Sequence, residues 1–383
     1  MMTNRLARRA SPGIERSGPW ARRSVPFWVP CLVTLFNAHC GPDPSYLPSL
    51  AAGQLELLAG SVPIDDAISS GDLSDEQVAK LRLIQDVRRY ARDTMQLNAG
   101  DSFTLFYDNR DATRSYNVSA SRKDRFEPVT WTFPIVGTVP YLGFFDRQQA
   151  DRQAESLGDD GFDVYMYEVD AYSTLGYLPN PVQAAMLRRG DISIVNTVIH
   201  ELLHGTIWRP GDVTFNESLA TFFGRTGALH YLRARFDDAP ELIEAATTRS
   251  DDTDRYNAFI LELYEELDTF YSSDLTSVEK IAGRELIYQA GRDRFVAEVQ
   301  PLMHMSQNYD WVADLPANNA WMLGNYRYNL DLDLFQRVYD ATGRDWRASL
   351  DVFRNAASAD DPKAHMRDWL ASPGRNPTQD PPD

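Results

Sequence analysis

Cysteine is scarce in this chain, and its position excludes one class of chemistry. The two cysteines, Cys31 and Cys40, both precede residue 41. The rest of the chain therefore has neither a thiol nucleophile nor an internal disulfide, which excludes a cysteine peptidase. Positive charge is also in short supply, since 38 Lys and Arg residues stand against 55 Asp and Glu residues, a formal net charge of −17. Because no basic cluster follows residue 40, we expect no nucleic-acid partner.

Residues 1–40 have the composition of an export segment. Six arginines up to residue 23 are followed by the apolar stretch 25–38, which is too short and too interrupted by proline for a membrane-spanning helix. We therefore expect an exported protein on the periplasmic side of the cell envelope. Ala38-His39-Cys40 only partly matches a bacterial lipidation site. Membrane attachment through a lipidated Cys40, a plain signal peptide cleaved nearby and an uncleaved anchor all stay open.

Residues 41–371 are expected to form a single catalytic unit of the α+β class. Helical periodicity predicts helices at residues 51–60, 75–96 and 146–156, whereas alternating and β-branched residues predict a β-rich part over 102–178. Two helices over 191–236 and a helical part over 252–371 follow. In the latter, an apolar stripe over 256–270 is expected to pack into the core. Residues 372–383 are rich in Pro and Asp and read as a disordered tail.

One motif stands out in the helical part, His200-Glu201-Leu202-Leu203-His204. Apolar residues at helical spacing predict a helix over 192–208, with Asp191 as its N-cap and Pro210-Gly211 as its end. Residues four apart lie on the same face of a helix, so both imidazoles can reach one metal ion. Glu201 projects beside them and can act as a general base without being a ligand.

A catalytic zinc site usually has three protein ligands, and Glu217 is our candidate for the third. It lies 13 residues after His204, at the start of the next predicted helix. Two helices joined by so short a turn should run antiparallel, which places both residues beside the turn. Thr214-x-x-Glu217 also fits a capping box, in which Glu217 would bind a backbone N–H instead. His230 is the alternative third ligand.

The chemistry also needs a group that stabilises the oxyanion formed during hydrolysis. Tyr328 is our first choice and Tyr172 the second, although either tyrosine could equally be a packed aromatic. Residues 171–177 could form an edge strand that pairs with an extended peptide substrate. An ordinary internal strand is the alternative.

The chain resembles a bacterial family of predicted aminopeptidases that are exported zinc enzymes. The resemblance rests on blocks that follow one another in the same order, at residues 51–58, 131–137, 141–145, 171–176, 200–204, 215–218 and 318–320. It implies a zincin-like metallopeptidase fold of the gluzincin kind, with His200, His204 and Glu217 as Zn²⁺ ligands and Glu201 as the catalytic base.

Two features of the chain depart from that family. Members often carry cysteine where this chain has Thr132 and Thr138, so a disulfide there is lost. The lipidation site at Cys40 is the other departure, and neither affects the metal ligands.

The kind of peptidase stays open at the level of sequence. An aminopeptidase needs a carboxylate that binds the α-amine of its peptide substrate, and residues 171–190 contain none. Glu168 and Asp170 are nearby. Aminopeptidase activity therefore comes from the resemblance, and an endopeptidase of the same mechanism is the first alternative. The second is a non-catalytic envelope or binding protein that retains the fold.

Overall fold

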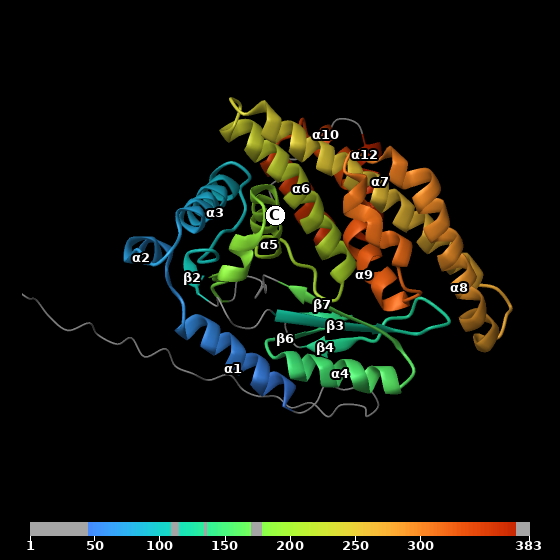
Figure 1. Ribbon diagram of the computed structural model, residues 1–383. Helices are drawn as coiled ribbons and strands as arrows, with labels where there is room; N and C mark the ends of the chain where they lie inside the picture. Colours follow the sequence, from blue (N-terminus) through green and yellow to red (C-terminus); the bar gives the residue numbers. More distant parts are fainter. Residues whose placement is uncertain (1–44, 109–114, 134–135, 170–177, 373–383) are drawn as a thin grey trace, which may run out of the picture. The chain divides into compact units, whose positions relative to one another are not determined.

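The computed structural model describes residues 45–108, 115–133, 136–169 and 178–372 (Figure 1). These residues belong to one compact unit. The predicted export segment with Cys40, the candidate edge segment 171–177 with Tyr172, and nearly all of the tail lie outside the described residues. Among the described residues, no helix is both long and apolar enough to span a membrane.

The N-terminal half contains both helices and short strands. The helices are α1 (Tyr46–Ala59), α2 (Ile64–Ser70), α3 (Asp75–Asp93) and α4 (Arg147–Asp159). The strands are β1 (Val62–Pro63), β2 (Leu105–Tyr107), β3 (Ser115–Ser121), β4 (Trp131–Phe133), β5 (Gly137–Val139), β6 (Leu142–Phe144), β7 (Asp163–Val169) and β8 (Val182–Gln183). The predicted helices and the β-rich part agree with these bounds to within a few residues, except that α1 begins five residues earlier.

The strands form three small sheets rather than one large sheet. In one sheet the order is β6-β3-β7, and both pairings are antiparallel. A second sheet has the order β1-β2-β8, with β2 and β8 parallel. The first sheet is covered on both faces, because α4 and α9 (Asn319–Asn329) each contact β3 and β7 from opposite sides (Figure 1).

The third sheet is the β4–β5 hairpin, and it rests on the turn that follows the motif helix. Thr132 and Thr138 face each other across the hairpin, with their Oγ1 atoms 2.9 Å apart. Gly137 has φ +82°, and a Cβ atom there would lie 2.5 Å from the backbone nitrogen of Gly211. Only glycine permits both this conformation and this approach. The hairpin is thus seated against the turn and leads directly to Tyr141.

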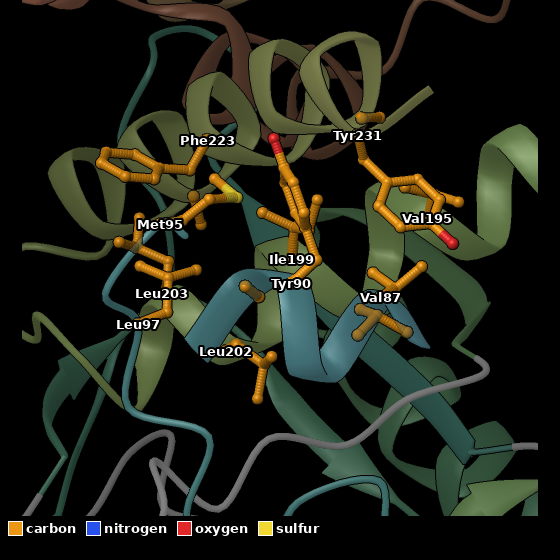
Figure 2. Packing of buried hydrophobic residues seen from close by; sticks show 14 of the residues in the cluster. Val87, Tyr90, Met95, Leu97, Val195, Ile199, Leu202, Leu203, Phe223 and Tyr231 are labelled. Atoms are coloured by element: carbon orange, nitrogen blue, oxygen red, sulfur yellow. The ribbon is translucent and has the colours of Figure 1, made fainter. Parts of the chain in front are cut away.

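The larger hydrophobic core lies around α5 (Asp191–His204) and α6 (Val213–Arg235). Figure 2 shows side chains of α3, α5 and α6 packed together with Met95, which follows α3. The predicted apolar face of the motif helix is confirmed, since Val195, Val198, Ile199 and Leu202 are all buried. This packing fixes the position of the motif helix through its apolar face, and the polar side chains of the motif are not needed for it.

The C-terminal half is helical. Its elements are α7 (Pro240–Tyr271), α8 (Ser277–Arg294), a π-helical segment (Phe295–Val299), α9, α10 (Leu332–Ala341), α11 (Trp346–Ser358) and α12 (Pro362–Ala371). The apolar stripe on α7 packs against α8 and α9 in a second core, as predicted. The helical part begins at Pro240 rather than at residue 252, because proline at the first helical position starts α7 one turn after α6.

Candidate metal centre

The last turns of α5 carry the motif residues. The helix begins after Gly190, so the prediction of Asp191 as N-cap was wrong: Asp191 lies in the first turn, where a carboxylate favours the positive end of the helix dipole. The helix ends at His204 and not at Trp208, because Gly205 closes it with a hydrogen bond from its backbone N–H to the carbonyl of Leu203. His204 is therefore the final helical residue.

Glu217 lies inside the second helix and is not a cap. Asp212 is the N-cap of α6, and its carboxylate accepts a hydrogen bond from the N–H of Phe215 at 3.0 Å. The capping alternative for Thr214-x-x-Glu217 is therefore wrong, because the helix starts two residues before a Thr214 cap would place it. Glu217 falls in the second turn, where its buried carboxylate faces α5.

The neighbouring Asn216 stabilises the turn between the two helices by hydrogen bonds. Its side-chain oxygen accepts a hydrogen bond from the N–H of Arg209 at 2.9 Å, and its amide donates to the Arg209 carbonyl at 2.8 Å. The Arg209 guanidinium donates in turn to the backbone carbonyls of Ala357, in the last turn of α11, and of Ala359, which follows that helix. The turn is thereby fixed to both α6 and the C-terminal helices, which sets the position of Glu217 relative to α5.

His200, His204 and Glu217 bring three donor atoms together. The two Nε2 atoms are 3.2 Å apart, and Oε2 of Glu217 lies 3.3 Å from Nε2 of His200 and 3.5 Å from Nε2 of His204. These three residues form a group that could hold a metal ion. Ligands about 2.0–2.1 Å from a tetrahedral zinc ion are separated by roughly 3.3–3.4 Å. The observed separations match that spacing, so the donor set fits the ion.

The charges at this group depend on one another. Burial would raise the pKa of Glu217, but His204 and His200 outweigh it and hold the pKa below its ordinary value. Burial would lower the pKa of His204, whereas the carboxylates of Glu217 and Glu201 turn the net direction upward. Without a metal, the group is therefore stabilised as a carboxylate facing a protonated imidazole. A divalent cation held by these residues would replace that proton.

Glu201 has the position expected of a base. Its Oε2 atom is buried and has no hydrogen-bond partner among the described residues. Its charge acts on His204, which places it beside the three donors. A buried carboxylate oxygen that makes no hydrogen bond retains a free lone pair, and this is the requirement for accepting a proton.

Of the two tyrosines predicted to stabilise an oxyanion, only Tyr328 lies within the described residues. It is partly buried on α9, and its ring stacks near that of His200, with centroids 6.2 Å apart and planes 23° from parallel. The Glu217 carboxylate and burial both raise the pKa of the Tyr328 hydroxyl, burial being the larger cause. The hydroxyl therefore stays protonated and can donate a hydrogen bond.

His230, the alternative third ligand, lies in another part of the structure. Its Nε2 atom is 3.2 Å from the hydroxyl of Tyr339, and it lines a pocket of about 420 Å³ between α6, α7 and α10. It is not part of the donor group that contains His200 and His204. The structure thus separates the two candidates for a third ligand, and Glu217 is the one beside the motif.

Sequence reasoning missed the polar residues that surround the donor group. Tyr141 donates a hydrogen bond to Oε1 of Glu217 at 3.5 Å, which leaves Oε2 facing the histidines. Arg327 lies over the Tyr141 ring, with its guanidinium carbon 5.7 Å from the ring centroid. Tyr167 on β7 accepts a hydrogen bond from Asn117 at 3.3 Å. The only available signal was weak: Tyr141 lies in a Gly- and Pro-punctuated stretch, and Arg327 between Tyr326 and Tyr328.

Comparison with known proteins shows the family of the chain. The chain belongs to the family described as "Putative aminopeptidase", whose model matches residues 45–368. The match runs from α1 into α12 and therefore includes every residue of the site. It assigns the chain to a peptidase family, as the sequence resemblance implied. Searches of curated proteins and of solved structures gave no match.

Proposed function

We propose that the chain is a zinc-dependent peptidase of a zincin-like fold, and specifically an aminopeptidase. The observation that carries the proposal is the donor triangle of His200, His204 and Glu217, with sides of 3.2–3.5 Å, next to a buried carboxylate without a hydrogen-bond partner. Nitrogen donors from two histidines and oxygen from one glutamate are a typical ligand set of catalytic zinc, which keeps a fourth position open. The family assignment supports the peptidase part of the proposal.

The three ligands would hold the ion, which when bound supplies a Lewis acid that acidifies water and polarises the scissile carbonyl. Glu201 accepts a proton from the attacking water on its free Oε2 atom and delivers it to the leaving amine. Tyr141 positions Glu217 through its hydrogen bond to Oε1, since a ligating carboxylate is held in place by its outer contacts. Tyr328 donates a hydrogen bond from its hydroxyl to the developing oxyanion.

Aminopeptidase action is the finer part of the proposal, and its support is the family description. The candidate carboxylates for the substrate α-amine are Glu168, at the end of β7, and Asp170, which lies outside the described residues. β7 is at the edge of its sheet in the described part of the chain. The hydroxyl of Tyr167, a residue of β7, lies against Tyr328, so this part of the strand comes close to the site.

The test uses the isosteric variant Glu201→Gln. It removes the base but none of the three ligands, so we expect the variant to bind zinc as the native protein does. Its kcat for peptide hydrolysis should fall by at least about 100-fold, the usual range for loss of a general base. Undiminished hydrolysis by the variant would show that Glu201 is not the base. A native protein that binds zinc but cleaves no peptide would favour the non-catalytic binding protein.

The choice of substrates separates the two kinds of peptidase. A free peptide and its N-acetylated form differ only in the charged α-amine. An aminopeptidase should cleave the first and leave the second intact, whereas an endopeptidase should cleave both at internal bonds. Mass spectrometry of the products identifies the bond that is broken.

A further inference from the structure

Arg327 is a buried cation that forms no ion pair with the described residues. Its side chain is 4% exposed, its Nη1 atom has no hydrogen-bond partner, and no carboxylate of the described residues forms an ion pair with it. The other buried arginines are paired: Arg284 binds Asp163 through both Nη atoms, and Arg292 binds Glu285 at 2.8 Å. An unpaired buried charge costs several kcal/mol. A guanidinium kept in that state needs an explanation beyond packing.

The surroundings of Arg327 place it beside the metal centre. Its guanidinium carbon lies 5.7 Å from the centre of the Tyr141 ring, and the hydroxyl of Tyr141 reaches Glu217. Burial raises the pKa of the Tyr167 and Tyr328 hydroxyls, and the charge of Arg327 opposes that effect at both. A single positive charge therefore lies near the phenol groups of Tyr141, Tyr167 and Tyr328, which are themselves close to Glu217.

The proposed peptidase function provides the substrate class for this cation. On that basis, we propose that Arg327 binds a carboxylate of the peptide substrate. A guanidinium presents a fork of N–H donors that matches a carboxylate in two parallel hydrogen bonds, and the free Nη1 supplies one of them. The carboxylate has two possible sources, the C-terminus of a short peptide or an acidic side chain close to the cleaved bond.

A purely structural role for Arg327 predicts a different effect of its replacement on stability. If Arg327 served only to pack against Tyr141, its removal would destabilise the fold. If Arg327 instead binds an anionic ligand, its charge is uncompensated in the free protein. Replacement by an apolar side chain of similar length then removes that charge, and the stability of the free protein stays equal or rises. Thermal denaturation of Arg327→Met distinguishes these cases. Arg292→Met is the matched control, since that buried arginine has its partners in place and its loss should lower stability.

The binding experiment uses the full protein with zinc and three peptides of one sequence. The first has a free C-terminal carboxylate, the second a C-terminal amide, and the third a C-terminal amide with one Gln replaced by Glu. We expect the Glu201→Gln protein with Arg327 intact to bind one of the two carboxylate peptides about 10- to 100-fold more tightly than the plain amide, as for a charged hydrogen bond. Arg327→Met should abolish that preference and leave the affinity for the plain amide unchanged. Arg327→Lys should retain a part of it.

The outcomes separate this inference from the proposed function. Calorimetric binding is measured in the Glu201→Gln background, so it does not depend on turnover. Equal affinity for all three peptides, or an equal loss for all three in Arg327→Met, overturns the carboxylate assignment. If the preference is present but the protein with Glu201 intact cleaves no peptide, the peptidase proposal fails and the carboxylate site stands. The peptide that is preferred identifies the source of the carboxylate.

Discussion

We expect the close contact between α5 and α6 at Gly224 to position the candidate metal ligands, and the addition of one methyl group there tests this expectation. A Cβ atom on Gly224 would lie 2.8 Å from Oδ1 and 3.0 Å from the backbone oxygen of Asn196. The side chain of Asn196 can turn away, but its backbone oxygen belongs to α5 and cannot. Gly224→Ala therefore forces the two helices apart by a few tenths of an ångström, and such overpacking costs about 1–3 kcal/mol.

Helix propensity acts in the opposite direction and must be controlled. Replacing glycine by alanine within a helix stabilises it by up to about 1 kcal/mol. Gly158 on α4 has no atom within 4 Å of an added Cβ, so Gly158→Ala reports that gain alone. We expect Gly158→Ala to be slightly more stable than the native protein and Gly224→Ala to be about 1–3 kcal/mol less stable than Gly158→Ala.

The same shift should weaken metal binding, because α6 carries Glu217 and α5 carries both histidines. Urea denaturation gives the stabilities, and competition with a chromogenic chelator gives the zinc affinities. We expect a lower affinity in Gly224→Ala and no change in Gly158→Ala. Equal stability and equal affinity in the two variants would show that close approach of α5 and α6 does not position the site.

Two further predictions concern pH and covalent linkage. The folded-state pKa of Glu217 is lowered, so its contribution to the stability of the metal-free protein is present above about pH 4.5 and is lost as pH falls. The folded-state pKa of His204 is raised, so its contribution to the same stability is present below about pH 6.5 and is lost as pH rises. The stability difference between metal-free native protein and Glu217→Gln, from thermal denaturation, should thus be greatest between those values, and a flat difference would contradict the coupling. The double variant Thr132→Cys/Thr138→Cys should form a disulfide on oxidation, since the two side chains meet across the hairpin. The disulfide should stabilise the fold by about 2 kcal/mol, because the loop that it closes is short. Free thiols that remain after oxidation would contradict this prediction.

Local sequence patterns were sufficient to predict the donor group. His200 and His204 stand four residues apart on a helix whose apolar face is evident, so their shared direction follows from helical geometry. Glu217 required only one more step, because a short turn between two helices must bring their adjacent ends together. The ends of the helices were less predictable. Gly205 ended α5 before Trp208, and Asp212 rather than Thr214 capped α6, because several residues there could serve as caps.

The residues around the donor group could not be predicted from such patterns. Tyr141 reaches Glu217 across 76 positions of sequence, through a hairpin whose placement depends on the close approach of Gly137 to Gly211. Arg327 is recognisable as unusual only when its burial and its lack of an ion pair with the described residues are known. In sequence it is one arginine among many, since a surface residue between two tyrosines would look the same.

The most direct test of the site is the zinc content of the purified protein after reconstitution and removal of loosely bound metal. Plasma mass spectrometry of the native protein, Glu201→Gln and Glu217→Ala compares an intact donor set, an intact set without the base and a set that lacks one ligand. We expect about one zinc per chain in the first two and little or none in Glu217→Ala, because a catalytic site requires three protein ligands. Zinc retained in full by Glu217→Ala, or absent from the native protein, would contradict the proposed metal centre.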